Sequence, residues 1–136
     1  MSTPGTIVAA YSADRFGEAA VEHAAGLARK EGARLVVVNA TPGNSLVDAR
    51  FAHDADITAL RDRLAADGLK VVVRHEVVSD VADAVIAAAD EEQAGLIVVG
   101  IRHRTPVGKL LLGSVAQRII LEAHCPVLAV KPSGEV

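Results

Sequence analysis

The chain has 136 residues, a length that one compact domain with one hydrophobic core usually fills, so we expect a single domain over residues 1–136. The net charge of −3 and the scattered bases argue against an extended nucleic-acid surface. No apolar stretch approaches the roughly 20 residues that cross a bilayer, and residues 1–6 do not resemble a signal peptide, so we expect a cytoplasmic protein without membrane contact. The single cysteine, Cys125, excludes an internal disulfide, and no spacing of histidines or cysteines indicates a metal site.

Five short runs rich in β-branched residues punctuate the chain. They are mostly unbroken rather than alternating, which is typical of parallel strands buried on both faces. We therefore predict strands at residues 6–11, 34–40, 70–78, 95–100 and 126–131.

The first two intervals between these runs carry helical signals. In the first, Ser12 or Asp14 can cap a helix with an apolar stripe, and Gly32 stands just past its end. The second interval predicts a helix with Asp54 and Asp56 in its first turn and Gly68 as its stop.

The last two intervals predict helices in the same way. Ser79 or Asp80 can cap the third. Ser114 and Gln117 have the spacing of a capping box for the fourth, which Pro126 ends. Strict alternation of strands and helices implies right-handed crossovers, so we predict an α/β fold, a doubly wound parallel sheet in a three-layer sandwich.

The loop at residues 101–113 leaves the carboxyl end of a predicted strand, where open parallel sheets bind ligands. The pair Gly113-Ser114 stands where free helix N–H groups begin, a suitable place for a phosphate. Three bases of the loop would add positive charge there: Arg102, Arg104 and Lys109. The alternative is a solvated basic loop whose glycines serve only turns and the helix start.

The same segment resembles the signature of the universal stress proteins, G-x2-G-x9-G-[S/T], followed by a helix and a PVL-type final strand. Its counterpart here is Gly100-Ile-Arg-His103, then nine residues to Gly113-Ser114, and later CPVLAVKP. The opening TIVAAYSADRFGEAAVEHAAGLARKEGARLVVVNATP is also similar to the first strand, helix and second strand of that family. The resemblance therefore covers nearly the whole chain.

The resemblance implies a flavodoxin-like, adenine-nucleotide α-hydrolase-like sheet of order 3-2-1-4-5 and homodimers through the C-terminal strand. In one branch of the family, ATP or AMP binds between the first and fourth strands, and the other branch lacks nucleotide. The residues that would surround the adenine are Ala10, Ser12 and Ala40. Those that would face the phosphates are Gly100, Arg102, His103, Gly113, Ser114 and Val115.

Two residues depart from the family pattern. Ser12 replaces the aspartate usual at the end of the first strand, and His103 replaces the second signature glycine, so we expect weaker binding than in the ATP-binding branch. The loop offers neither a metal-holding carboxylate nor a residue to place water, which leaves at most slow ATP hydrolysis, with Mg²⁺ entering only with nucleotide. Two functions stay open: a dimeric nucleotide-binding regulator in stress response, or a ligand-free stress protein that acts through protein contacts.

Overall fold

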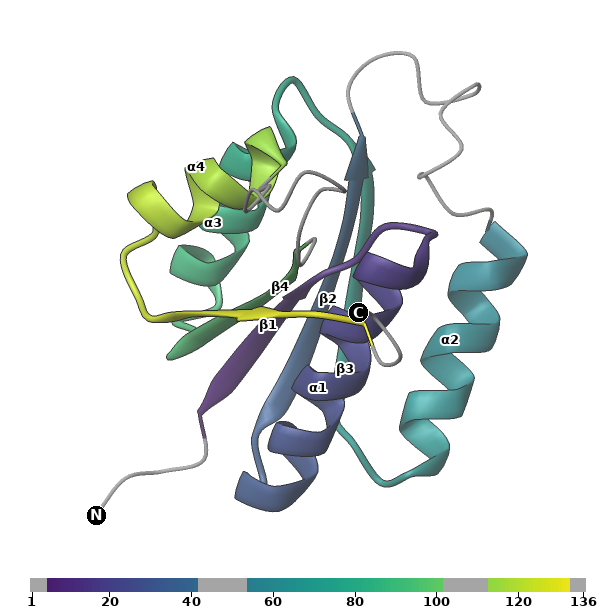
Figure 1. Ribbon diagram of the computed structural model, residues 1–136. Coiled ribbons are helices and arrows are strands. Elements are labelled where there is room, and N and C mark those ends of the chain that lie inside the picture. Colours follow the sequence, from purple (N-terminus) through teal and green to yellow (C-terminus); the bar gives the residue numbers. More distant parts are fainter. Residues whose placement is uncertain (1–4, 42–53, 102–112, 133–136) are drawn as a thin grey trace.

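The computed structural model of the chain describes residues 5–41, 54–101 and 113–132. In these ranges five parallel strands form one sheet of order β3-β2-β1-β4-β5 (Figure 1). Strands and helices alternate along the chain: β1 Thr6–Ala10, α1 Arg15–Glu31, β2 Arg34–Thr41, α2 Asp54–Ala66, β3 Val71–Val77, α3 Val81–Glu91, β4 Leu96–Gly100, α4 Ser114–Glu122 and β5 Val127–Val130. The predicted strands, the predicted fold class and the order 3-2-1-4-5 are confirmed.

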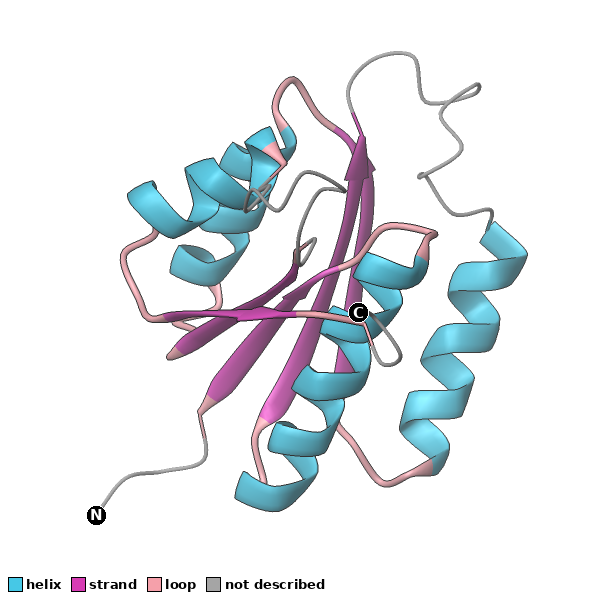
Figure 2. Cartoon of the chain, viewed as in Figure 1, coloured by secondary structure: helices cyan, strands magenta, loops and turns pink. Residues whose placement is uncertain are grey.

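Two helical layers cover the sheet, with α1 and α2 on one face and α3 and α4 on the other (Figure 2). Successive strand residues point to opposite faces, so Ile7 and Ala9 pack under α1 while Val8 packs under α3 and α4. The three central strands, β1, β2 and β4, must therefore be largely apolar on both faces, which explains the unbroken runs in the sequence. Within the described ranges, none of the helices has the length and apolar character needed to span a bilayer.

The predicted helix ends are largely confirmed. The Asp14 carboxylate caps α1 by accepting the N–H groups of Phe16 (3.1 Å) and Gly17 (2.9 Å). Gly32 ends α1 in the left-handed conformation at φ 68°, where glycine carries no steric cost. Asp80 caps α3 by accepting the Asp83 N–H at 2.9 Å.

The expected capping box at the start of α4 is wrong. The N-cap is Gly113, which makes no side-chain hydrogen bond, and Ser114 is already the first helical residue. The Gln117 N–H donates to the Gly113 carbonyl at 2.9 Å, as the first backbone bond of the helix. The helix begins one residue earlier than the capping box predicts. Ser114 therefore does not occupy the N-cap position, from which its hydroxyl could cap the helix.

Candidate functional site

A cavity of about 550 Å³ opens at the carboxyl end of the sheet, where β1 and β4 diverge toward helices on opposite faces. Parallel sheets place their ligand sites at this reversal of strand order. The ends of β1, β2 and β4 and the starts of α1, α3 and α4 line the cavity: Ala10, Tyr11, Ser12, Asp14, Phe16, Gly17, Val38, Ala40, Ser79, Asp80, Val81, Ala82, Val85, Val99, Gly100, Ile101, Gly113, Ser114, Val115, Ala116 and Arg118.

The cavity brings together seven of the residues that the sequence predicts for a site: Ala10, Ser12, Ala40, Gly100, Gly113, Ser114 and Val115. Arg102 and His103 lie outside the described residues. Sequence reasoning assigned Asp14 and Asp80 only to helix caps and missed Arg118 altogether. A cap at a strand-to-helix turn on the carboxyl edge of the sheet is the signal that could have placed both aspartates here.

Three helices begin at the cavity, and they differ in how their first N–H groups are satisfied. Asp14 covers the start of α1 and Asp80 covers the start of α3 with their own carboxylates. The N-cap of α4 is Gly113, which has no side chain to accept these groups, and Gly113 and Ser114 are exposed. Because the unpaired N–H groups of a helix start carry partial positive charge, α4 offers the cavity an anion-binding end.

The two signature glycines in the described residues serve different purposes. A Cβ on Gly100 would lie 2.0 Å from the Phe16 carbonyl oxygen, so this glycine lets the end of β4 touch the start of α1. Gly113 has ordinary angles, φ −64° and ψ 156°, and a Cβ there would meet no atom within 4 Å. The backbone conformation at position 113 therefore does not require glycine. The absence of a side chain there leaves space beside the α4 amides for a ligand.

The turn that follows β1 is fixed by several hydrogen bonds. The Ser12 hydroxyl donates to the Asp14 carboxylate at 2.9 Å. Asn39, which is buried on β2, donates its amide to the Tyr11 carbonyl at 2.9 Å, and the Tyr11 N–H donates to the Val38 carbonyl. The Ser12 hydroxyl is thus oriented, while its oxygen keeps the capacity to accept a hydrogen bond from a ligand.

Arg118 forms the main charged contact at the opposite wall. Its guanidinium lies 2.7 Å from Asp80 and 2.6 Å from Asp83 on the α3 side, and 3.2 Å from Glu122 on its own helix. The Asp83 N–H lowers the pKa of the Asp80 carboxyl, and Arg118 lowers it further. Asp80 is therefore ionised at neutral pH.

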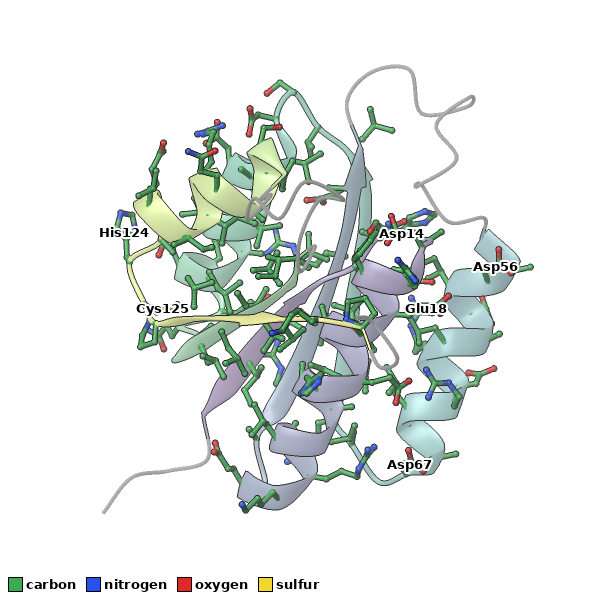
Figure 3. All side chains as sticks on the ribbon, viewed as in Figure 1. Asp14, Glu18, Asp56, Asp67, His124 and Cys125 are labelled. Atoms are coloured by element: carbon green, nitrogen blue, oxygen red, sulfur yellow. The ribbon has the colours of Figure 1, made fainter. Side chains whose placement is uncertain are left out.

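A smaller hollow of about 180 Å³ lies between α1 and α2, beside Tyr11. Glu22 and Arg63 form an ion pair at 2.9 Å across it. Burial raises the pKa of the Tyr11 phenol, and the charges of Glu18 and Asp56 raise it further; Figure 3 labels both acids on these two helices. This hollow is too small for a nucleotide-sized ligand.

The remaining metal-ligating and nucleophilic side chains in the described ranges include those of His124 and Cys125. No set of three or more histidine, cysteine or acidic side chains there could hold a metal ion. His124 and Cys125 are neighbours in the chain between α4 and β5 (Figure 3), and His124 contacts Asp90 at 3.0 Å. Burial raises the pKa of the Cys125 thiol, and Asp90 raises it further, so the reactive thiolate is disfavoured.

Comparison with known proteins identifies a single family. A sequence model of the Universal stress protein family matches residues 4–131. The chain is 50% identical over 128 residues to a universal stress protein of Mycolicibacterium smegmatis, an alignment that covers 94% of this chain and 98% of the relative.

Solved structures share the fold. A universal stress protein in complex with cAMP has a TM-score of 0.70 and 28% identity, with 97% of this chain and 100% of that one covered. The universal stress protein of Archaeoglobus fulgidus in complex with dAMP has a TM-score of 0.60 and 28% identity, with coverage of 96% and 100%. This chain also spans 45% of a longer Archaeoglobus fulgidus universal stress protein, with 96% of this chain covered, a TM-score of 0.77 and 24% identity.

Proposed function

The chain belongs to the universal stress protein family, and we propose that it is a regulatory module of stress response that binds an adenine nucleotide, AMP or ATP, in the cavity at the end of its sheet. The uncapped start of α4 carries the proposal. Within the described ranges, it presents the backbone N–H groups of Gly113, Ser114 and Val115 without a side-chain cap and beside open space, which is the geometry that receives a phosphate. The relatives solved with cAMP and dAMP support the choice of ligand.

The strand ends offer an apolar surface to the adenine ring. Ala10, Ala40 and Val99 line the cavity between the turn after β1 and the starts of α3 and α4. The oxygen of Ser12 accepts a hydrogen bond from the ligand, as a neutral group rather than the carboxylate that the family usually has here. Affinity is therefore lower than in relatives with aspartate at this position. In the proposal, Mg²⁺ enters only with the nucleotide, hydrolysis is slow or absent, and the protein acts in the cytoplasm.

Calorimetric titration of the unaltered chain with AMP, ATP and adenosine tests the proposal. Gly113→Val should abolish AMP binding, because the branched side chain fills the space beside the α4 amides. The matched control is Gly95→Val, since a Cβ at Gly95 also meets nothing within 4 Å but lies before β4, at the opposite end of the sheet. That variant should bind AMP like the unaltered chain.

The result that refutes the proposal is equally definite. If the unaltered chain gives no heat and no thermal stabilisation with AMP or ATP, nucleotide binding is excluded. If Gly113→Val binds as tightly as Gly95→Val, the phosphates do not lie at α4.

The second candidate function is a nucleotide-independent stress protein that acts through protein contacts. It is favoured by β5, an edge strand whose Leu128 is 38% exposed. Edge strands present unpaired N–H and C=O groups, and an apolar edge of this kind is suited to a second copy of the chain. A homodimer through β5 is part of both proposals, and the nucleotide titration distinguishes them.

A further inference from the structure

Arg118 joins the two helix starts that form one wall of the cavity. It lies in the second turn of α4 and reaches Asp80, the N-cap of α3, at 2.7 Å, as well as Asp83 in the first turn of α3 at 2.6 Å. Its guanidinium also contacts Glu122, one turn along α4. Arg118 and Asp80 both line the cavity, whereas Asp83 and Glu122 do not.

The charges of the described residues that line the cavity are unfavourable for an anion. Among the described lining residues the acids are Asp14 and Asp80, and Arg118 is the base. The Asp14 carboxylate accepts three hydrogen bonds, from the Ser12 hydroxyl and from two backbone N–H groups of α1, which spread its negative charge. Asp80 accepts the Asp83 N–H and keeps a charge that Arg118 offsets.

We propose that Arg118 is the specificity-determining residue of this cavity: by neutralising Asp80, it permits a ligand that carries negative charge. The inference rests on the proposed function and adds to it the group that sets charge preference. Arg118 acts here through Asp80 rather than by contact with the ligand, so it is a positioning residue for the anion site. Without Arg118, the ionised Asp80 repels a phosphate held at the start of α4 in the same cavity.

A purely structural role of Arg118 predicts different behaviour. If the guanidinium only tied α4 to α3, its loss would misplace the cavity wall and weaken every ligand, charged or neutral. Neutralisation of Asp80 instead predicts a loss that grows with ligand charge, decreases in salt, and disappears when Asp80 itself loses its charge.

The experiment compares Arg118→Gln, the double variant Arg118→Gln with Asp80→Asn, and the unaltered chain, by calorimetric titration with AMP, adenosine and inorganic pyrophosphate. Asparagine is as good an N-cap as aspartate, so the double variant keeps the cap of α3 while it removes the charge. The control is Arg29→Gln, which removes one positive charge and a comparable 3.0 Å ion pair with Asp67. Asp67, labelled in Figure 3, follows the C-terminal end of α2 and lines neither hollow.

Arg118→Gln should weaken AMP binding by about threefold to tenfold and pyrophosphate by more, while adenosine binding changes by less than about twofold. The double variant should recover most of the AMP affinity, and Arg29→Gln should bind AMP like the unaltered chain. Raising salt from about 0.1 M to about 1 M, which shortens the screening length from about 10 Å to about 3 Å, should reduce the difference between Arg118→Gln and the unaltered chain.

Two results would overturn this inference alone: an Arg118→Gln chain that binds AMP as tightly as the unaltered chain, or equal losses for AMP and adenosine without recovery in the double variant. If the unaltered chain binds neither AMP nor pyrophosphate, the proposed function and this inference both fail.

Discussion

Replacing Gly100 with alanine should lower the free energy of unfolding by about 3 kcal/mol, because the end of β4 lies directly against the start of α1. The new Cβ would lie 2.0 Å from the Phe16 carbonyl oxygen and 2.6 Å from its carbonyl carbon, far inside van der Waals contact. The atoms in the way are backbone, and the N–H of Phe16 is held by the Asp14 cap, so no side-chain rotation relieves the overlap. Overpacking costs about 1–3 kcal/mol, and a backbone obstacle places this change at the upper end.

Urea unfolding followed by circular dichroism measures the effect, and 3 kcal/mol corresponds to a melting temperature about 10 °C lower for a domain of this length. Gly113→Ala is the matched control from the same signature. At that position the entropy gain of removing a glycine offsets the weaker cap, and the free energy should change by less than about 1 kcal/mol. A loss below about 1 kcal/mol for Gly100→Ala would refute the close contact between β4 and α1.

Two further predictions concern the edge strand and the phenol. Leu128→Lys should shift sedimentation toward monomer, whereas Val130 is 6% exposed and a lysine there would disrupt the core; an unchanged dimer would place the interface elsewhere. Tyr11 is the chain's one tyrosine, and there is no tryptophan, so tyrosinate absorbance reports its ionisation alone. Burial, then the charges of Glu18 and Asp56, raise the pKa of the Tyr11 phenol above 10.0 in the folded state. The stability that the neutral phenol contributes is therefore complete below about pH 10 and is lost as pH rises through the folded pKa. Tyr11→Phe should remove that loss, and a native midpoint at or below 10.0 would contradict the prediction.

Local chemistry was sufficient to predict most of the fold. The caps at Asp14 and Asp80 and the left-handed Gly32 depend on residues within a few positions along the chain, and a sequence displays such patterns directly. The start of α4 was misplaced by one residue because Ser114 satisfies a capping pattern that is also compatible with the first helical position.

The site was predicted less completely than the fold, because several of its contacts join residues that are far apart in the chain. The sequence pattern places Gly113 and Ser114 at the start of a helix. The strand order, which the family resemblance supplies, then brings this helix start to the point where ligands bind. Arg118 escaped prediction because its partner Asp83 is 35 positions away, so that only the packing of α4 against α3 brings them together. Gly100 lines the cavity as predicted for a site residue, but its close approach to α1, an element far earlier in the chain, is visible only in the structure.

The turn between β1 and α1 has a consequence for how the cavity responds to damage elsewhere in the molecule. Asn39 fixes the Tyr11 carbonyl from inside the sheet, and Gly17 presses against the backbone of Ser12 so closely that a Cβ there would lie 2.1 Å from its oxygen. Ligand-binding segments are usually drawn from the least stable parts of a protein. This wall is instead tied to the buried core by the Asn39 amide and the Gly17 contact, so we expect it to open mainly together with the sheet. We therefore expect a core substitution distant from the cavity to reduce the fraction of molecules able to bind more than it changes the affinity of each folded molecule.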